Sequence, residues 1–195
     1  MNVQLAPNTS ADKRESILES TLKLIRQYGF HGTAMNQIAQ EAHVAIGTIY
    51  HYFESKDDLM LATLEHCKRM LNESAFQNAD KASAYRVRLD QIWINLVSFY
   101  IEHPDVLSFL EQFYSSPYVK QLLGNETVCG QDTVGDFLQE GILGGHIKEM
   151  DVNVVSSAFI GTAIAAAKRT SNRTFVFEDD HKNHMLSILW EGIKI

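Results

Sequence analysis

The stretch that decides the fold is residues 33–56, which read TAMNQIAQEAHVAIGTIYHYFESK. Thr33 can cap a short helix that runs to about residue 42, because its hydroxyl can accept a hydrogen bond from a free N–H group of the first turn. Residues 43–44 interrupt this helix, and a second short helix is expected over about residues 45–52. Neither helix is long enough to be stable alone, so both must pack against another element.

The preceding residues predict that supporting element. Apolar side chains recur at helical spacing over residues 17–28, Ser10 can start the helix, and Gly29 can end it. Two short helices that are joined by a tight turn and rest on a longer helix form a helix-turn-helix, whose second helix enters the major groove of DNA. Because Ile49 and Phe53 must face the first helix, the other side chains of the second short helix should face outward.

A fourth helix is expected directly after this motif. Ser55 and Asp58 form a start that resembles a capping box, and the helix should run to about residue 71. Residues 73–83 are small and polar, which marks the expected boundary between two parts of the chain. We therefore divide the chain into a flexible leader (1–10), a helix-turn-helix domain (11–56), a connecting helix and linker (57–83), and a ligand-binding and dimerisation domain (84–195).

The rest of the chain continues the helical pattern. One apolar face extends over residues 85–100, Pro104 and Pro117 bracket a shorter helix, and a last helix is expected over residues 185–193. The run TFVFE at residues 174–178 is the only β-like segment, and we interpret it as an extended connector. The predicted fold class is all-α, with an N-terminal three-helix domain followed by a larger helical domain.

The charge distribution limits how the chain can bind a polyanion. The formal net charge is -7, which argues against a protein that coats nucleic acid or membrane by charge alone. Residues 1–56 hold five basic and five acidic side chains, whereas the rest of the chain holds 12 basic and 19 acidic ones. Any surface that faces phosphates should therefore lie near the N-terminus and use a few positioned groups.

Residues 33–56 resemble the tetracycline-repressor (TetR) family, and the resemblance covers about residues 12–66. Its most specific part is the run GTIYHYF at residues 47–53, which is followed by Ser55 and Lys56. The resemblance implies a ligand-responsive transcriptional regulator, most often a repressor, that binds a palindromic operator in double-stranded DNA as a homodimer and is released by a small molecule. It also implies that a variable ligand-sensing domain follows the helix-turn-helix.

The outward side chains of the motif are the candidate DNA contacts. Gly47 allows the backbone to approach DNA closely, and Thr48 can donate to a phosphate or a base edge. Lys56 would act on a phosphate together with the N–H groups at the start of its helix. The predicted DNA-binding residues are Thr33, Asn36, Gln37, Ile46, Gly47, Thr48, Tyr50, His51, Tyr52 and Lys56.

Three positions depart from the family's pattern. His43 stands in the turn where glycine is common, but histidine is among the residues that tolerate positive φ. Ala45 replaces the usual Ser or Thr cap of the reading helix, a loss that typically costs about 1 kcal/mol. Ile46 replaces a residue that is often polar and reads bases, so specificity should depend on the neighbouring positions and on DNA shape.

Two further sets of residues follow from the resemblance. A ligand cavity is expected among the aromatic and apolar side chains Trp93, Leu96, Tyr100, Phe109, Phe113, Tyr114 and Phe137, although such residues at helical spacing are more often core. The last two long helices, one in the stretch rich in small residues at 152–170 and the other near the end of the chain, are expected to dimerise. Packing within one chain is the alternative. The predicted interface residues are Val134, Leu138, Val155, Phe159, Ala163 and Ala166. The segment between Pro104 and Pro117 should touch the end of the fourth helix. It is therefore the candidate element that transmits the effect of ligand binding from one domain to the other.

Other functional classes have weaker support. The chain has no G-x-S-x-G, no phosphate-binding glycine loop and no H-E-x-x-H, so we expect no enzyme and no cofactor. His181 and His184, with the preceding Asp179 and Asp180, could bind a metal, but a solvated helix start explains them better. A helical protein that binds other proteins, or a metal, and not DNA is the remaining alternative.

Cys67 and Cys129 are far apart and have no C-x-x-C partner. They fit a reduced cytoplasmic compartment, as buried thiols or, alternatively, as a redox-sensing pair. The start of the chain has no signal-peptide pattern, and no stretch of eighteen apolar residues occurs, so we expect a cytoplasmic protein that does not enter the membrane. The effector, the operator, the target genes and the direction of regulation do not follow from the residues.

Overall fold

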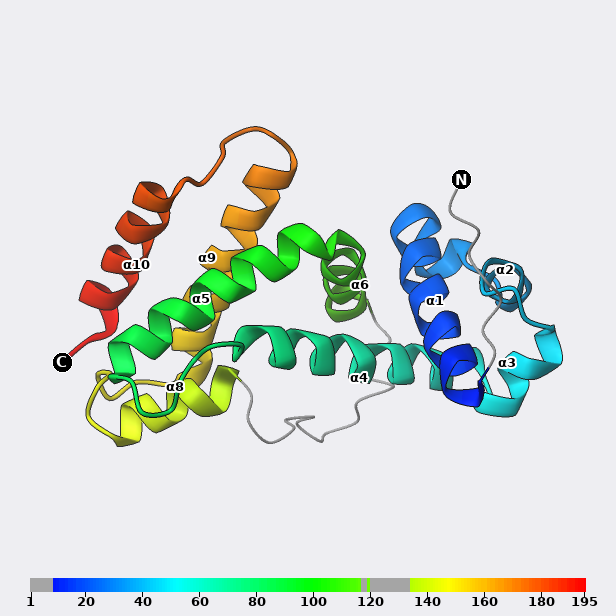
Figure 1. The fold of residues 1–195 in the computed structure, drawn as a ribbon, viewed down its shortest axis with the longest axis horizontal. Coiled ribbons are helices and arrows are strands. Elements are labelled where there is room, and N and C mark those ends of the chain that lie inside the picture. The colour runs from blue at the N-terminus through cyan, green and yellow to red at the C-terminus, as the bar shows by residue number, and fades with distance from the viewer. Residues whose placement is uncertain (1–8, 117–118, 120–133) are drawn as a thin grey trace. The chain divides into compact units, whose positions relative to one another are not determined.

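The computed structural model describes residues 9–116, 119 and 134–195, and within these ranges the chain is all-α, as predicted (Figure 1). The only strand-like pairing in the described part is an isolated bridge between Ile147 and Lys194. The helices are α1 (Ser10–Gly32), α2 (Met35–Glu41), α3 (Ile46–Tyr52), α4 (Lys56–Ala75), α5 (Tyr85–Glu102), α6 (Pro104–Ser115), α8 (Val134–Leu143), α9 (Val152–Ser171) and α10 (Asp179–Ile193).

The chain divides into two compact units. The first unit holds α1, α2, α3, α6 and the part of α4 up to Lys68, and the second holds the end of α4 together with α5, α8, α9 and α10. The sequence-based division placed residues 104–115 in the larger domain. The packing of α6 on α1 instead groups them with the N-terminal helices.

The first unit is built on α1, which α2 and α3 contact on one side and α6 contacts as well. Ile17, Leu18 and Ile25 of α1 are fully buried. Ile49 of α3 and Phe53 are also buried, as the apolar spacing predicts. Burial of such side chains stabilises the unit by about 1.5–3 kcal/mol each. This packing holds helices that are only seven residues long.

The helix starts in this unit match the sequence in part. Asp58 N donates to the Ser55 hydroxyl over 3.0 Å, and Glu54 N donates to an Asp58 carboxylate oxygen over 3.0 Å, which confirms the predicted start of α4. The predicted cap at Thr33 is wrong, because the N-cap of α2 is Ala34. The amide of Ala34 donates to the side chain of Gln37, which closes the first turn of α2.

The turn between α2 and α3 follows the residues that stand there. His43 adopts a φ of 54°, so the chain turns without the glycine that is common at this point. Ala45 is the N-cap of α3 and makes no side-chain capping bond, as its methyl group requires. Packing of Ile49, and not capping, therefore holds the start of α3 in place.

The second unit is centred on the contact between α5 and α9. Its core contains Ile92 and Trp93 of α5 and Phe159 of α9, all buried. The indole N–H of Trp93 donates to the hydroxyl of Thr162 over 3.1 Å, so this large side chain has a polar partner. Tyr85 adds a stacked contact with Phe137 of α8, at 4.6 Å between ring centroids.

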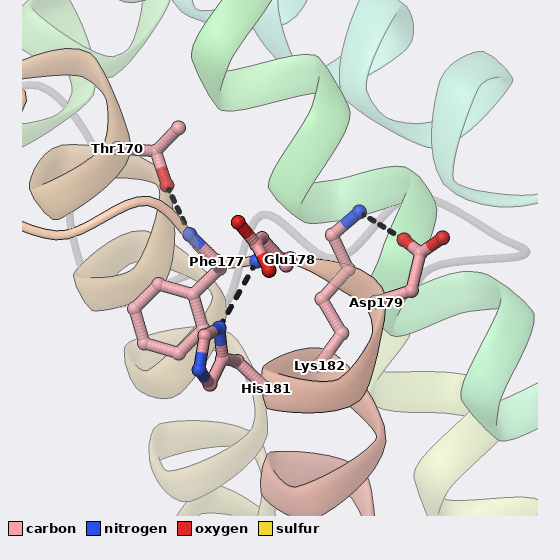
Figure 2. Close-up of polar contacts among 6 residues, drawn as sticks. All are labelled: Thr170, Phe177, Glu178, Asp179, His181 and Lys182. Atoms are coloured by element: carbon pink, nitrogen blue, oxygen red, sulfur yellow. Dashed lines mark hydrogen bonds and ion pairs between the residues drawn. The ribbon is translucent and has the colours of Figure 1, made fainter.

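Residues 174–178 form no strand and connect α9 to α10, as the sequence predicts. Figure 2 shows how this connector is held: Phe177 N donates to the Thr170 hydroxyl, and Glu178 N donates to His181 Nδ1 over 3.3 Å. Lys182 pairs with Asp179 in the first turn of α10. His181 therefore caps a helix start, and no group of three or more His, Cys, Asp or Glu side chains in the described ranges is arranged to hold a metal ion.

Candidate nucleic-acid interface

The outward face of α3 is the centre of the candidate interface. Ile46, Gly47, Tyr50 and His51 are exposed, and 53% of the surface of Tyr50 is accessible to solvent. Ile49 lies on the opposite side and is fully buried. The helix thus has one face fixed in the core and another that offers a phenol, an imidazole and an aliphatic side chain, groups that can meet base edges, phosphates and thymine methyls.

Gly47 lies in the first turn of α3, next to open space. A Cβ atom built at this position meets no other described atom within 4 Å. The fold of the unit therefore gives no steric reason for a glycine here. A missing side chain at an exposed helix start lets an external backbone, such as that of a DNA strand, approach closely.

Thr48, Asn36 and Gln37 border this face. Thr48 is partly exposed, and its amide donates to Ala45 O within the first turn of α3. Asn36 and Gln37 are exposed at the start of α2. The side-chain oxygen of Gln37 already accepts the Ala34 amide, so its NH₂ group is the part that can bind an external acceptor.

Tyr52 was predicted as a DNA contact, but its hydroxyl binds within the chain. It lies 2.8 Å from the Ser10 hydroxyl and donates to Ser10 O over 3.0 Å. The contact joins the end of α3 to the start of α1, 42 residues earlier. No local sequence pattern identifies such a pair, and Ser10 is the partner that the sequence analysis missed.

Thr33 and Lys56 are also engaged within the chain. Thr33 is only 1% exposed, and its hydroxyl donates to Gly29 O over 2.8 Å. Lys56 Nζ donates to Phe30 O over 2.7 Å and to Thr33 O over 2.6 Å. Burial lowers the pKa of Lys56, and the nearby Asp57 carboxylate opposes that shift. The predicted set of ten DNA contacts therefore separates into seven surface residues and three that bind other parts of the same unit.

The residues predicted to line a ligand pocket come from both compact units. Trp93, Leu96, Tyr100 and Phe137 are buried in the second unit. Phe109 and Phe113 belong to the first unit, where they pack against Phe30 of α1 at centroid distances of 5.3 and 6.2 Å, and the neighbouring Tyr114 is exposed. Phe109 and Phe113 are thus core residues of the unit that contains the reading helix.

The six residues predicted for the dimer interface are buried within a single chain. They contribute to the packing of α8 and α9 inside the second unit, and none is more than 3% exposed: Val134, Leu138, Val155, Phe159, Ala163 and Ala166. These side chains have no surface left for a second copy, which corrects the expectation. Helical periodicity marked the buried face of α9 correctly but did not show that the chain itself covers this face.

Of the two cysteines, only Cys67 lies within the residues that the structure describes. Cys67 is buried in α4, and burial raises the pKa of its thiol to about 12. Cys129 lies outside the described residues. None of the helices in the described ranges has the length and apolar character needed to cross a membrane.

The chain resembles known proteins along nearly its whole length. Residues 17–63 match the family model described as bacterial regulatory proteins of the tetR family, and residues 85–194 match the tetracyclin repressor-like C-terminal domain. An uncharacterized HTH-type transcriptional regulator of Haemophilus influenzae is 27% identical over 183 residues, which cover 94% of this chain and 96% of that protein. The fatty acid metabolism regulator protein of Bacillus subtilis is 27% identical over 154 residues, which cover 77% of this chain and 79% of that protein.

Solved structures show the same relationship. The crystal structure of a TetR-family transcriptional regulator from Haemophilus influenzae matches with a TM-score of 0.81 at 26% identity, over 95% of this chain and 98% of that one. A transcription regulator from a Shewanella species matches with a TM-score of 0.81 at 23% identity, over 94% and 98% of the two chains. The helix order described above is therefore found in other solved proteins.

Proposed function

Because the chain belongs to the tetR family of bacterial regulatory proteins, we propose that it is a ligand-responsive repressor that binds a palindromic operator as a homodimer. The family and the relatives are DNA-binding transcriptional regulators, a non-enzymatic class. The observation that carries the proposal is the exposed face of α3, which has no core role while the opposite face is fully buried. A regulator of this kind acts in the cytoplasm, where bacterial DNA lies.

The proposed reading surface consists of side chains that are free to meet DNA. Tyr50, His51 and Thr48 would contact base edges and phosphates, and Gly47 would allow close approach of the backbone. Ile46 would contact a thymine methyl or a sugar. The DNA-binding set that we retain from the sequence analysis is Asn36, Gln37, Ile46, Gly47, Thr48, Tyr50 and His51.

A homodimer is proposed because α3 alone spans too few base pairs, whereas two reading helices about 34 Å apart meet successive turns of the major groove. The outward face of α9 supports this proposal. Four exposed apolar or small residues follow one another on this face at intervals of four, three and four residues, which is the spacing of the contact line between two packed helices. They are Val154, Ala158, Gly161 and Ala165. Ile188 on α10 is also exposed. We propose this face, in place of the buried one, as the surface that a second copy covers.

We propose that the effector binds in the second unit, near Trp93, Leu96, Tyr100 and Phe137. We also propose that α6 transmits the effect of this binding to the helix-turn-helix. Within the first unit, Phe109 and Phe113 of α6 pack on Phe30 of α1. Gln112 Nε2 also donates to Ile25 O over 3.3 Å. A shift of α6 would thus act on the end of α1.

DNA binding is tested with duplexes selected from fragments of the source genome that the protein retains. Tyr50→Ala should weaken binding of the selected duplex at least about fivefold, because a good base contact contributes about 1–3 kcal/mol. Tyr28→Ala is a matched control, since Tyr28 of α1 is 52% exposed and Tyr50 is 53% exposed. Equal affinities of the two variants would show that the outward face of α3 does not read DNA.

The finer parts of the proposal have separate tests. Deleting one half-site of the selected duplex should abolish tight binding, and the stoichiometry should be two chains per duplex. A compound that raises the melting temperature of the free protein should also lower its affinity for the duplex, because an effector must bind one of the two states better. A compound that stabilises the protein and leaves DNA affinity unchanged is not an effector.

A further inference from the structure

Lys56 is the first residue of α4, and its ammonium group is turned into the protein. It donates to Phe30 O over 2.7 Å and to Thr33 O over 2.6 Å. These carbonyls precede Lys56 by 26 and 23 residues, so the contact joins segments that are distant in sequence. Phe30 lies in the last turn of α1 and Thr33 is the C-cap of α1, so both carbonyls lie where α1 leads into α2.

Electrostatics explains this position. The start of a helix carries a partial positive charge, so a lysine in the first turn of α4 is unfavourable unless other groups compensate for it. The end of α1 supplies that compensation, because the last carbonyl groups of a helix lack intrahelical partners and carry partial negative charge. Lys56 thus acts as a cationic cap on α1 from a different helix.

Three backbone carbonyls at this connection accept side-chain hydrogen bonds. Gly29 has a φ of 73°, which interrupts the regular helix, and its carbonyl accepts the Thr33 hydroxyl. The carbonyls of Phe30 and Thr33 accept Lys56. Partly buried backbone carbonyls that lose such partners destabilise the fold, so Lys56 supports the conformation of this segment.

The contact also encloses the reading motif. Thr33 directly precedes Ala34, the N-cap of α2, and Lys56 follows the end of α3 by four residues. The bond between Lys56 and Thr33 therefore closes residues 34–55 at both ends. Closing a segment removes alternative arrangements of its ends, which fixes α2 and α3 relative to α1.

We propose that Lys56 is a positioning residue of the DNA reader, which holds α2 and α3 in their reading arrangement through the α1–α2 connection and does not itself neutralise a DNA phosphate. The inference rests on DNA binding by this chain. In this proposal Lys56 raises the affinity for every DNA sequence by stabilising the arrangement of α2 and α3, without touching the DNA. A phosphate contact would instead depend on the salt concentration.

The test compares Lys56→Met and Lys56→Gln with the wild-type protein and with Lys81→Met, which removes an exposed lysine of the other unit. Affinity for the selected duplex is measured between about 50 and 200 mM salt, at a temperature at which circular dichroism shows every variant folded. Lys56→Met should bind at least about tenfold more weakly, with an unchanged slope of log affinity against log salt. Lys56→Gln keeps an N–H donor, so its affinity for the duplex should lie between those of the wild-type protein and Lys56→Met.

A lysine that neutralises a phosphate directly gives a different result: its removal would decrease the magnitude of the slope by about 0.9, equally in the Met and Gln variants. A second measurement uses the free protein. Amide hydrogen exchange of residues 34–38 should become faster in Lys56→Met and stay unchanged in Lys81→Met. A smaller slope, or unchanged exchange at these amides, would overturn the proposal. Unchanged DNA affinity would reduce Lys56 to a structural role and overturn it as well. If all selected duplexes fail to bind the wild-type protein, the proposed function fails first.

Discussion

The hydroxyl of Tyr52, the last residue of α3, lies 2.8 Å from the hydroxyl of Ser10, the first residue of α1. It also donates to Ser10 O over 3.0 Å. The reading helix is therefore tied to the start of α1 at one end, while Phe53 is buried in the core immediately afterwards. This relationship makes Tyr52 part of the support of α3.

Tyr52→Phe removes this link and leaves the ring in place. A hydrogen bond of this kind contributes about 0.5–1.5 kcal/mol, with the lower end expected because the contact is exposed. The free energy of unfolding, measured with urea, should decrease by about that amount. A double-mutant cycle with Ser10→Ala should give a non-zero coupling energy. Additive effects of the two changes would show that the link between the two hydroxyl groups does not form in solution.

Gly47→Ala should separate stability from DNA binding. The added Cβ meets no described atom within 4 Å, and alanine is better than glycine inside a helix by about 0.5–1 kcal/mol. The melting temperature should therefore stay equal or rise, while affinity for the selected duplex falls. Gly192→Ala is the control, because a Cβ there also meets open space, on α10. A Gly47→Ala variant that binds DNA as well as Gly192→Ala would contradict the proposed close approach.

Val154→Glu should dissociate the proposed dimer. Val154 is 62% exposed on α9, so a charge there leaves the fold of one chain intact but is costly in an apolar interface. Sedimentation equilibrium should show a monomer, and the affinity for a two-half-site duplex should fall. Val87→Glu on α5 is the matched control, at 58% exposure. Identical assembly of the two variants would remove the outward face of α9 from the proposal.

Glu19 should make stability depend on pH. Burial raises its pKa above the ordinary value, and the carboxylates of Glu15 and Asp105 raise it further. A group whose pKa is higher in the folded state favours folding at low pH, and this contribution is lost as the pH rises through the folded pKa. Glu19→Gln should therefore raise the melting temperature at pH 7, and the gain should vanish below about pH 4.

The control for this prediction is Glu65→Gln on α4. The Glu65 side chain is exposed and lies 3.9 Å from Lys68, a pair that contributes little to stability at the surface. This variant should show no gain at pH 7. A gain that is equal at pH 4 and pH 7 for Glu19→Gln would point to packing as its cause and not to charge.

Short-range patterns predicted much of the first unit. The periodicity of apolar residues identified the buried face of α3 through Ile49 and Phe53, and the Ser55–Asp58 pair located the start of α4. His43 was recognised as a residue that can turn the chain at positive φ. These features depend on atoms within one or two turns of each other, so a local stretch of residues contains the information that specifies them.

Longer-range features were predicted less well. Periodicity marked Val155 and Phe159 as apolar contacts, but it could not show whether α5 and α8 or a second chain covers them. The same limitation applies to Phe109 and Phe113, because periodicity could not show that they pack on Phe30. An amphipathic helix specifies that one face must be buried, and the arrangement of the other helices decides what buries it.

The order of the residues alone thus established an all-α chain with a DNA-reading motif at residues 33–56 and identified its outward face. The folded arrangement decided which polar groups on that motif remain available. Tyr52 and Lys56 have the chemistry of DNA contacts, yet their hydroxyl and ammonium groups bind atoms 23–42 residues away. A polar side chain takes whichever partner the tertiary structure brings within about 3 Å, and that partner cannot be read from its neighbours in the sequence.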